Sequence, residues 1–278
     1  MKTLNWEALK PAAKKDQIGA YYRTLYAAWG CQHWWPARSR FEVIVGAYLT
    51  QNTSWNNVEI AMRRLRGAER LNLEGIRSLP VEELENLIRP AGYFRQKATR
   101  LKTFVAFVDR EYNGSLRRMF AQPTEKLREE LLALNGVGRE TADSILLYAG
   151  QHPVFVVDAY TRRILERHEN LSADAGYEEI RALCERELSG PQNIRGALAR
   201  TAPSATMASP GGGAHMMHAS AHAPSPMSRA KRSDLAQIYN DMHGLIVTVG
   251  KRYCLKREAR CDQCPLKKFL PKGDGTKG

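Results

Sequence analysis

Apolar residues recur every three or four positions along most of the chain, which is the pattern of amphipathic helices. One predicted helix carries Ile18, Tyr22, Leu25 and Tyr26 on a single side. Alternation with the period of a strand is almost absent, and the connections between helices are short. The pattern predicts an all-α fold, with helices over residues 15–30, 41–49, 56–66 and 95–112 and another beginning near residue 79.

Two further predicted helices flank a turn that contains two glycines. Leu127 and Leu131 mark the first helix, and Ile145 and Ala149 mark the second. Between them, residues 135–138 read N-G-V-G, and glycine reaches backbone angles closed to other residues. Such a hairpin leaves backbone N–H groups exposed where the second helix begins, and these groups bind anions. We expect the anion to be a phosphate of a nucleic-acid backbone.

An aspartate follows the second helix of this hairpin at the end of a short apolar run. Residues 154–157 read V-F-V-V after Pro153, which predicts an extended segment. This segment delivers Asp158 to the start of another helix, which carries arginines at positions 162, 163 and 167. Aspartate is a preferred N-cap residue, which gives Asp158 a structural explanation.

Residues 191–232 interrupt the helical pattern. Small residues, proline and glycine dominate this segment, and it lacks the apolar surface needed to offset chain entropy. We predict a disordered insert rich in Ala, Ser, Pro, Gly and His. His215, His218 and His222 share helical spacing inside it, but a flexible stretch without carboxylates is a poor metal site.

The charge balance indicates a polyanionic partner. The chain has 278 residues, enough for one large or two modest domains, with 42 Lys and Arg against 29 Asp and Glu and a net charge of +13. Binding to a polyanion through such a surface weakens steeply with salt. No apolar run approaches eighteen residues, and no signal peptide is evident. We therefore expect a cytoplasmic protein without a membrane partner.

Three of the five cysteines lie close together near the C-terminus. Cys254, Cys261 and Cys264 are spaced C-x6-C-x2-C, which favours metal ligands in a reducing compartment over a disulfide framework. The surrounding loop is basic, and we expect it to hold a cationic surface against a nucleic acid. Its basic residues are Lys251, Arg252, Lys256, Arg257, Arg260, Lys267 and Lys268.

The sequence L-N-G-V-G-R-E-T-A-D followed by V-F-V-V-D-A-Y resembles the helix-hairpin-helix (HhH-GPD) DNA glycosylases of the endonuclease III superfamily. The resemblance implies base excision from double-stranded DNA with a damaged base, by a monomer. It implies that Gly136, Val137, Gly138 and Arg139 bind DNA, and that Asp158 is the catalytic carboxylate facing a flipped nucleotide.

The resemblance also implies two helical lobes around a DNA-binding cleft. We expect a six-helix barrel lobe over residues 41–150, with the hairpin at its end. Residues 1–40 and 151–278 would form the second helical lobe, with the cysteine-rich metal-cluster loop near its end. The insert at 191–232 would interrupt that lobe.

One position departs from the bifunctional members of the family. These carry a lysine two residues after the second glycine of the hairpin, and that lysine attacks the sugar and goes on to cut the strand. Glu140 occupies the position here. A carboxylate cannot form a Schiff base, so we predict hydrolytic base release without strong AP-lyase activity.

Several further segments are similar to bacterial 3-methyladenine DNA glycosylase III. They include W-W-P at residues 34–36 and L-T-Q-N-T-S-W at residues 49–55. This similarity implies that Trp34, Trp35, Pro36 and Trp55 wall the base pocket. Indole faces attract a cation such as a 3-methylated purine. Consecutive tryptophans do not easily face one pocket, so we favour Trp35 and Trp55 for it and Trp34 for the core.

Other residues match family positions that contact DNA. Gln51 corresponds to the glutamine that fills the hole left by the flipped base, a hole that base flipping always creates. Tyr93 and Phe94 lie in a turn where relatives place an intercalating wedge. Lys97 and Arg100 follow on the next helix, where they would either reach phosphate or lie on a solvated face.

The three clustered cysteines match the first three ligands of the superfamily's iron–sulfur loop, C-x6-C-x2-C-x5-C. The fourth position holds Leu270, whereas a [4Fe–4S] cluster normally takes four cysteines. Cys184 and His243 are candidates by residue type for a distant fourth ligand. We favour an iron–sulfur cluster over zinc, which a Cys3His set would also hold.

Two alternative functions remain open from the sequence. Removal of uracil or thymine from mismatches would use the same fold but needs polar contacts to a pyrimidine edge, which Trp55 does not supply. A non-catalytic protein that binds DNA structures would have no need of Asp158. The favoured function is a monofunctional glycosylase for alkylated purines such as 3-methyladenine.

Overall fold

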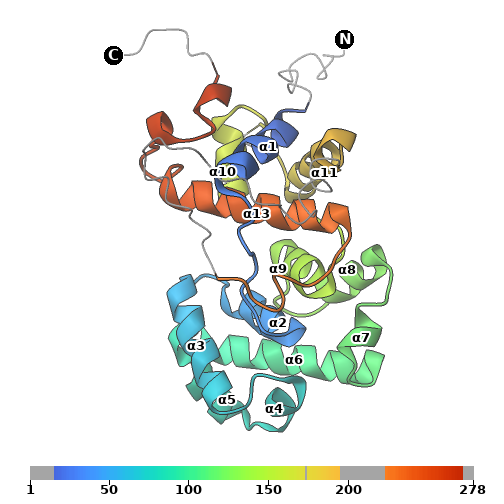
Figure 1. The fold of residues 1–278 in the computed structure, drawn as a ribbon. Coiled ribbons are helices and arrows are strands. Elements are labelled where there is room, and N and C mark those ends of the chain that lie inside the picture. Colours follow the sequence, from blue (N-terminus) through green and yellow to red (C-terminus); the bar gives the residue numbers. More distant parts are fainter. Residues whose placement is uncertain (1–15, 173, 195–222, 272–278) are drawn as a thin grey trace, which may run out of the picture. The chain divides into compact units, whose positions relative to one another are not determined.

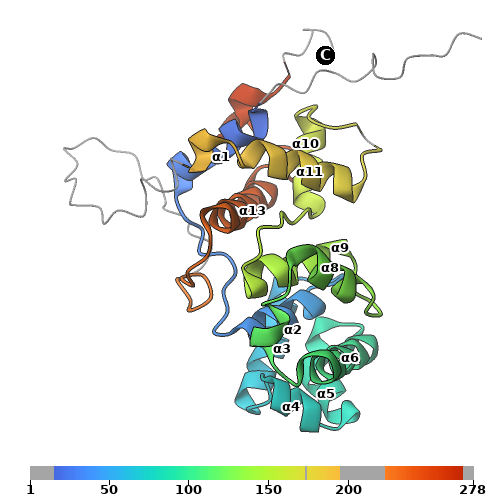
Figure 2. The same cartoon turned by 90° about the vertical axis from the view of Figure 1, so that its right-hand side faces the viewer.

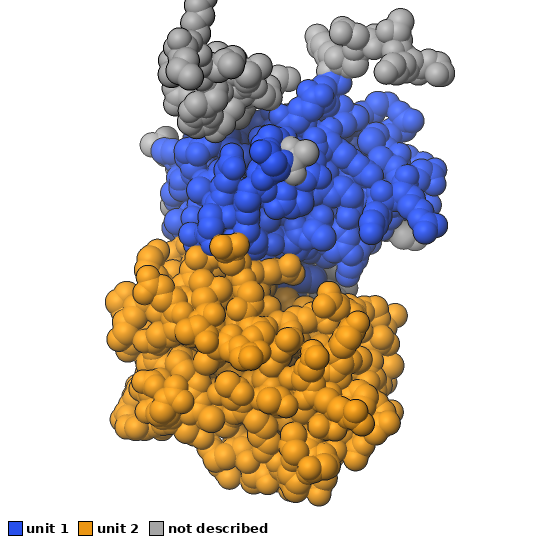
Figure 3. All heavy atoms as spheres, turned by 180° about the vertical axis from the view of Figure 1, so that it is seen from behind, with its two compact units in different colours: residues 1–34, 155–223, 233–278 blue, residues 35–154, 224–232 orange. Residues whose placement is uncertain are grey.

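The computed structural model describes residues 16–172, 174–194 and 223–271. The described chain is helical, with no strand and one isolated bridge between Cys254 and Ala259, so the all-α prediction is confirmed (Figure 1). None of its helices has the length and apolar character that crossing a membrane requires. The chain forms two compact units, coloured separately in Figure 3: unit 1 comprises 1–34, 155–223 and 233–278, and unit 2 comprises 35–154 and 224–232.

Unit 2 is built around helix α2, Arg40–Leu49, which is buried from Phe41 to Leu49. Ser39 caps this helix by accepting a hydrogen bond from the Glu42 amide. The buried helix packs against α3, α6 and η3. The other helices of unit 2 are α3 (Trp55–Gly67), α4 (Leu73–Ser78), α5 (Val81–Ile88), η2 (Arg89–Ala91), α6 (Phe94–Tyr112), α7 (Leu116–Met119), α8 (Thr124–Leu132), α9 (Arg139–Ser144) and η3 (Ile145–Gly150).

Unit 1 is built around helix α13, Asp234–Arg252, which is buried without a break from Ile238 to Gly250. A long helix that is apolar on most sides needs partners all round. Here α1, α10 and α11 pack against it (Figures 1 and 2). The other helices are α1 (Gln17–Trp29), α10 (Ala159–Arg167), α11 (Tyr177–Leu188), η4 (Cys261–Gln263) and η5 (Lys267–Phe269).

The unit boundaries differ from the expected lobes. Unit 2 begins at Trp35 rather than at residue 41, and it also includes residues 224–232. The prediction of a disordered insert is wrong for its described ends. Residues 191–194 are helical, with Asn193 buried. At the other end, Met227 donates its backbone N–H to the Ala37 carbonyl, and Met227 and Ser228 are buried. Residues 195–222, with the three spaced histidines, lie outside the described residues.

Candidate functional site

The hairpin between α8 and α9 has the backbone geometry that its glycines allow. Gly136 adopts a φ of +78°, a left-handed conformation that favours glycine. Val137 is buried and anchors the turn, whereas Gly138 caps α9 and is exposed together with Arg139 and Glu140. The described hairpin thus presents its second glycine and the start of α9 to solvent, as binding to a phosphate backbone requires.

A buried ion pair braces the two helices of the hairpin. Arg128 of α8 donates from Nε to Asp143 Oδ1 at 2.7 Å and from Nη2 to Asp143 Oδ2 at 3.1 Å. The Asp143 side chain is fully buried. A bidentate pair of this kind fixes orientation as well as distance, so it sets the angle between the helices. No sequence motif indicates this pair.

Gln51 is tied to the same hairpin. Its Nε2 donates to the Gly136 carbonyl at 3.0 Å and to the Thr141 hydroxyl at 2.9 Å. Its Oε1 accepts a hydrogen bond from Arg100 Nη1 at 2.8 Å. The side chain is therefore held in one orientation beside the turn, and its role in filling a vacated base position stays a prediction.

Lys97 has a structural role. It is 1% exposed, and its Nζ donates to the carbonyls of Leu49 and Ala91 at 2.9 and 2.8 Å. Burial lowers its pKa to about 8. The expectation that Lys97 reaches phosphate or lies on a solvated face is wrong, because helix periodicity directs it into the core of unit 2.

Tyr93 and Phe94 are placed differently in their turn. Tyr93 has a φ of +44° and is 66% exposed, which is unusual for a large aromatic side chain. Phe94 is half-buried, with the guanidinium groups of Arg89 and Arg95 over its ring at 4.9 and 5.8 Å. Of the two wedge candidates, Tyr93 has the exposure that intercalation needs.

An aromatic pocket of about 460 Å³ lies in unit 2. Trp35, Pro36 and Trp55 line it, with the two indoles edge to face at 5.1 Å. The Trp55 Nε1 donates to Glu59 Oε1 at 2.9 Å. Charged side chains that no sequence motif indicates also line the pocket: Arg38, Glu59, Arg63 and Arg66.

The chain separates the two consecutive tryptophans. Trp35 packs against Gly46 and Tyr148 within unit 2. Trp34 belongs to unit 1, where its ring lies 6.0 Å from that of His243. Only Trp35 of this pair lines the unit 2 pocket.

Asp158 caps helix α10 in unit 1. Its Oδ1 accepts hydrogen bonds from the Thr161 amide at 2.7 Å and the Thr161 hydroxyl at 2.9 Å. Its Oδ2 lies 3.6 Å from His243 Nε2, and the carboxylate side chain is 12% exposed. Burial lowers the pKa of His243, while the charge of Asp158 opposes that shift. The arrangement gives an oriented carboxylate beside an imidazole that is neutral at physiological pH.

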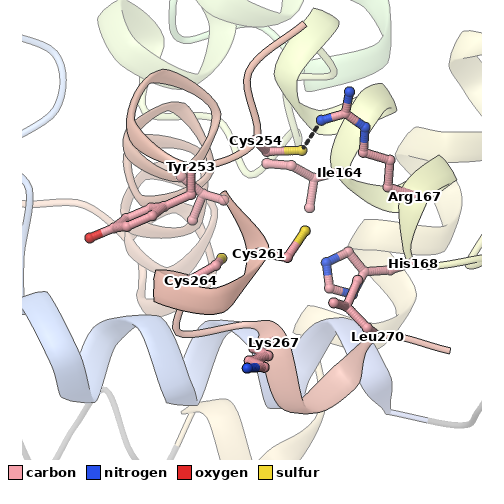
Figure 4. A pocket seen from close by; sticks show the side chains of 10 residues that line it. Ile164, Arg167, His168, Tyr253, Cys254, Cys261, Cys264, Lys267 and Leu270 are labelled. Atoms are coloured by element: carbon pink, nitrogen blue, oxygen red, sulfur yellow. Dashed lines mark hydrogen bonds between the residues drawn. The ribbon is translucent and has the colours of Figure 1, made fainter. Parts of the chain in front are cut away.

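The three clustered cysteines line one cavity at the end of unit 1. His168, Leu270 and Lys267 line the same cavity (Figure 4). Arg167 Nη1 donates to Cys254 Sγ at 3.1 Å, as a thiolate ligand would favour. Neither Cys184 nor His243 lines this cavity, so both suggestions for a fourth ligand are wrong.

The donor set of this cavity fits a thiolate-bound metal group. Burial raises the pKa of Cys264, and the neighbouring Cys261 and Cys254 add to the effect. Three adjacent thiolates need a cation to be stable together. Burial lowers the pKa of His168, which leaves its imidazole neutral, and Nδ1 meets no partner at hydrogen-bond distance. Among the described residues, no three His, Cys, Asp or Glu side chains are arranged to bind a single metal ion.

Comparisons with known proteins agree on one family. Residues 45–189 match the HhH-GPD superfamily base excision DNA repair protein family. A protein of Methanocaldococcus jannaschii described as a DNA repair glycosylase is 38% identical over 258 residues, which are 92% of this chain and 96% of that protein. Endonuclease III of Thermotoga maritima is 31% identical over 55% of this chain and 69% of its own length.

A solved structure extends the similarity to the fold. The 3-methyladenine DNA glycosylase MagIII of Helicobacter pylori, bound to 1,N6-ethenoadenine, superimposes with a TM-score of 0.64 at 26% identity. The match covers 85% of this chain and 97% of that chain.

Proposed function

The chain belongs to the HhH-GPD superfamily of base excision DNA repair proteins, and we propose that it is a monofunctional DNA glycosylase that releases alkylated purines such as 3-methyladenine. The observation that carries the proposal is the unit 2 pocket walled by Trp35, Pro36 and Trp55. Electron-rich indole faces attract a flat cation, and a methylated purine is such a cation. The bound ethenoadenine of the similar H. pylori enzyme is likewise a modified purine.

Asp158 is the proposed catalytic carboxylate. Loss of a base leaves positive charge on the sugar, and a fixed carboxylate stabilises that charge without reorganisation. The two hydrogen bonds from Thr161 fix one carboxylate oxygen, which leaves the other oxygen to act on sugar or water. A cationic base is already a good leaving group, so this scheme needs no strong general acid.

Release without strand cleavage follows from the residue at the start of α9. Glu140 is exposed at the position where bifunctional relatives hold their lysine. A carboxylate does not form a Schiff base with the opened sugar, so water is the nucleophile. We propose that the products are the free base and an abasic site in an intact strand.

DNA would be held by the hairpin, by the exposed Tyr93 and by the net charge of +13. A cationic surface contributes affinity that does not depend on sequence, and the exposed aromatic ring would wedge apart the stack during flipping. Gln51, fixed beside the hairpin, is the proposed occupant of the vacated position.

The test is to incubate the protein with methylated duplex DNA and to identify released bases by mass spectrometry. We expect 3-methyladenine among the products and little release of uracil from a matched duplex. The competing function, excision of uracil or thymine from mismatches, predicts the reverse. Efficient uracil release with 3-methyladenine untouched would replace the proposed substrate class.

A further inference from the structure

The cavity between α10 and the C-terminal loop brings together four donors from three places in the chain. Cys254 follows α13, Cys261 and Cys264 bracket η4, and His168 follows α10. Figure 4 shows the His168 ring beside Cys261, with Leu270 next to the ring. Leu270 stands where a fourth cysteine would be spaced, but its side chain has no donor atom.

His168 has a buried ring nitrogen that nothing in the described chain explains. The residue is 9% exposed, and its Nδ1 is buried without a hydrogen-bond partner. The adjacent Tyr21 ring packs edge-on at 5.3 Å, and its hydroxyl is already bonded to Gln17 and Asn170. A buried polar atom without a partner is uncommon in native proteins and calls for a ligand or an ion.

The residue immediately before this histidine, Arg167 at the end of α10, is hydrogen-bonded to the cysteine loop. Arg167 Nη1 bonds Cys254 Sγ at 3.1 Å and the Leu255 carbonyl at 2.8 Å. Arg163, one turn earlier, donates to the Cys254 carbonyl at 2.8 Å. These contacts hold the histidine against the loop, so it does not need a large movement to serve the same centre as the cysteines.

We propose that His168 is the fourth ligand, through Nδ1, of a [4Fe–4S] cluster whose other ligands are Cys254, Cys261 and Cys264. An imidazole supplies the missing donor on a helix end, in place of a fourth loop cysteine. When bound, the cluster supplies a redox-active centre that also holds the basic loop in shape. A neutral imidazole in place of a thiolate removes one negative charge, which raises the reduction potential of the centre.

The test compares four full-length proteins reconstituted anaerobically with ferrous iron and sulfide: the parent, His168→Ala, His168→Cys and His168→Ala with Leu270→Cys. Iron and sulfide content, circular dichroism and base release are measured on each. We expect about four irons per chain in the parent. We expect most of this iron to be lost in His168→Ala, and to return in His168→Cys and in the double variant.

Spectroscopy separates a ligand from a residue that merely packs nearby. The reduced cluster of the parent should show hyperfine coupling to an imidazole nitrogen, and His168→Cys should keep its iron but lose this coupling and titrate at a lower potential. Full iron content in His168→Ala, with an unchanged spectrum, would overturn the proposal, and so would zinc binding without sulfide. A parent protein that takes up no iron on reconstitution yet still releases bases would reject the cluster while leaving the glycosylase function intact.

Discussion

Trp55 is the residue on which the proposed substrate class depends most. Replacement with Phe keeps an aromatic face with weaker attraction for a cation, and replacement with Ala removes the face. Base–aromatic stacking is worth roughly 1–3 kcal/mol, which is about one to two decades in rate when expressed in the transition state. We expect 3-methyladenine excision to fall from parent to Trp55→Phe to Trp55→Ala in single-turnover assays, with the melting temperature nearly unchanged.

Glu59 provides the matched control for this series. It accepts the hydrogen bond of the Trp55 indole and is the one acidic residue among those that line the described pocket. Glu59→Gln keeps an acceptor but removes the charge. If aromatic faces hold the cationic base, Glu59→Gln should retain most of the activity. A larger loss in Glu59→Gln than in Trp55→Ala would assign the charge recognition to the carboxylate instead.

In the proposed mechanism, Glu140 is the residue that prevents strand cleavage. Borohydride reduction traps a Schiff base as a covalent protein–DNA adduct, and the parent should give no substantial adduct because the position holds a carboxylate. Glu140→Lys should give one, and Glu140→Gln should behave as the parent. A weak adduct through the N-terminal amine would persist in all three proteins. Substantial trapping in both the parent and Glu140→Gln would mean that another amine acts as nucleophile.

At single residues, local backbone features can be predicted from the sequence, whereas long-range contacts cannot. The hairpin glycines and Asp158 occupy the predicted turn and helix start, because their local backbone demands are visible in the sequence. The placement of His168 in one cavity with distant cysteines, and the contacts of Lys97 with the core, depend on three-dimensional packing. No spacing rule relates a histidine after α10 to a loop that follows it by more than 80 residues.

The stability of the α8–α9 hairpin depends on the buried ion pair between Arg128 and Asp143. Arg128→Met would remove the bidentate ion pair from the fully buried Asp143 carboxylate, and breaking a buried pair in this way costs about 3–5 kcal/mol. We expect a corresponding loss in the free energy of unfolding, measured by denaturant titration. Lys126→Met is the control on the same helix, since its pair with Glu130 is exposed and contributes at most about 1 kcal/mol. Equal losses of unfolding free energy in Arg128→Met and Lys126→Met would show that the buried pair does not stabilise the hairpin.

The sequence predicts the presence of a helix more reliably than the residues at which the helix begins and ends. Periodicity located the helix at 95–112, which forms as α6 over Phe94–Tyr112. Threonine is a common N-cap residue, but the N-cap of α8 is Pro123, and the Thr124 hydroxyl forms a hydrogen bond with His152. Residues 224–232 lack apolar periodicity, yet they are ordered by contacts with the distant Ala37, which local composition cannot reveal.

The whole molecule should lose stability in mild acid. Burial lowers the pKa of His152 and of His243, so the unfolded chain binds these protons more readily than the folded protein. The stability they contribute is present above the unfolded-state pKa, about 6.5, and is lost as pH falls from there toward their folded-state values. Each group contributes a slope of at most about 1.4 kcal/mol per pH unit.

The measurement is the free energy of unfolding of the parent and of His152→Gln between pH 8 and pH 5. The parent should be the more pH-sensitive of the two, with the difference between them developing below about pH 6.5. Parallel curves for the two proteins across this range would show that His152 titrates equally in both states.

The central question for the whole molecule is whether it is an enzyme that acts through Asp158 or only a DNA-binding protein. Asp158→Asn is suited to answering it, because asparagine also caps helices and would keep the contact with the Thr161 amide. Single-turnover release of 3-methyladenine and binding to an abasic-site duplex are measured on parent and variant. We expect base release by Asp158→Asn to be reduced by about 10²–10⁴-fold, with binding nearly intact. Release by Asp158→Asn at a rate near that of the parent would contradict this expectation.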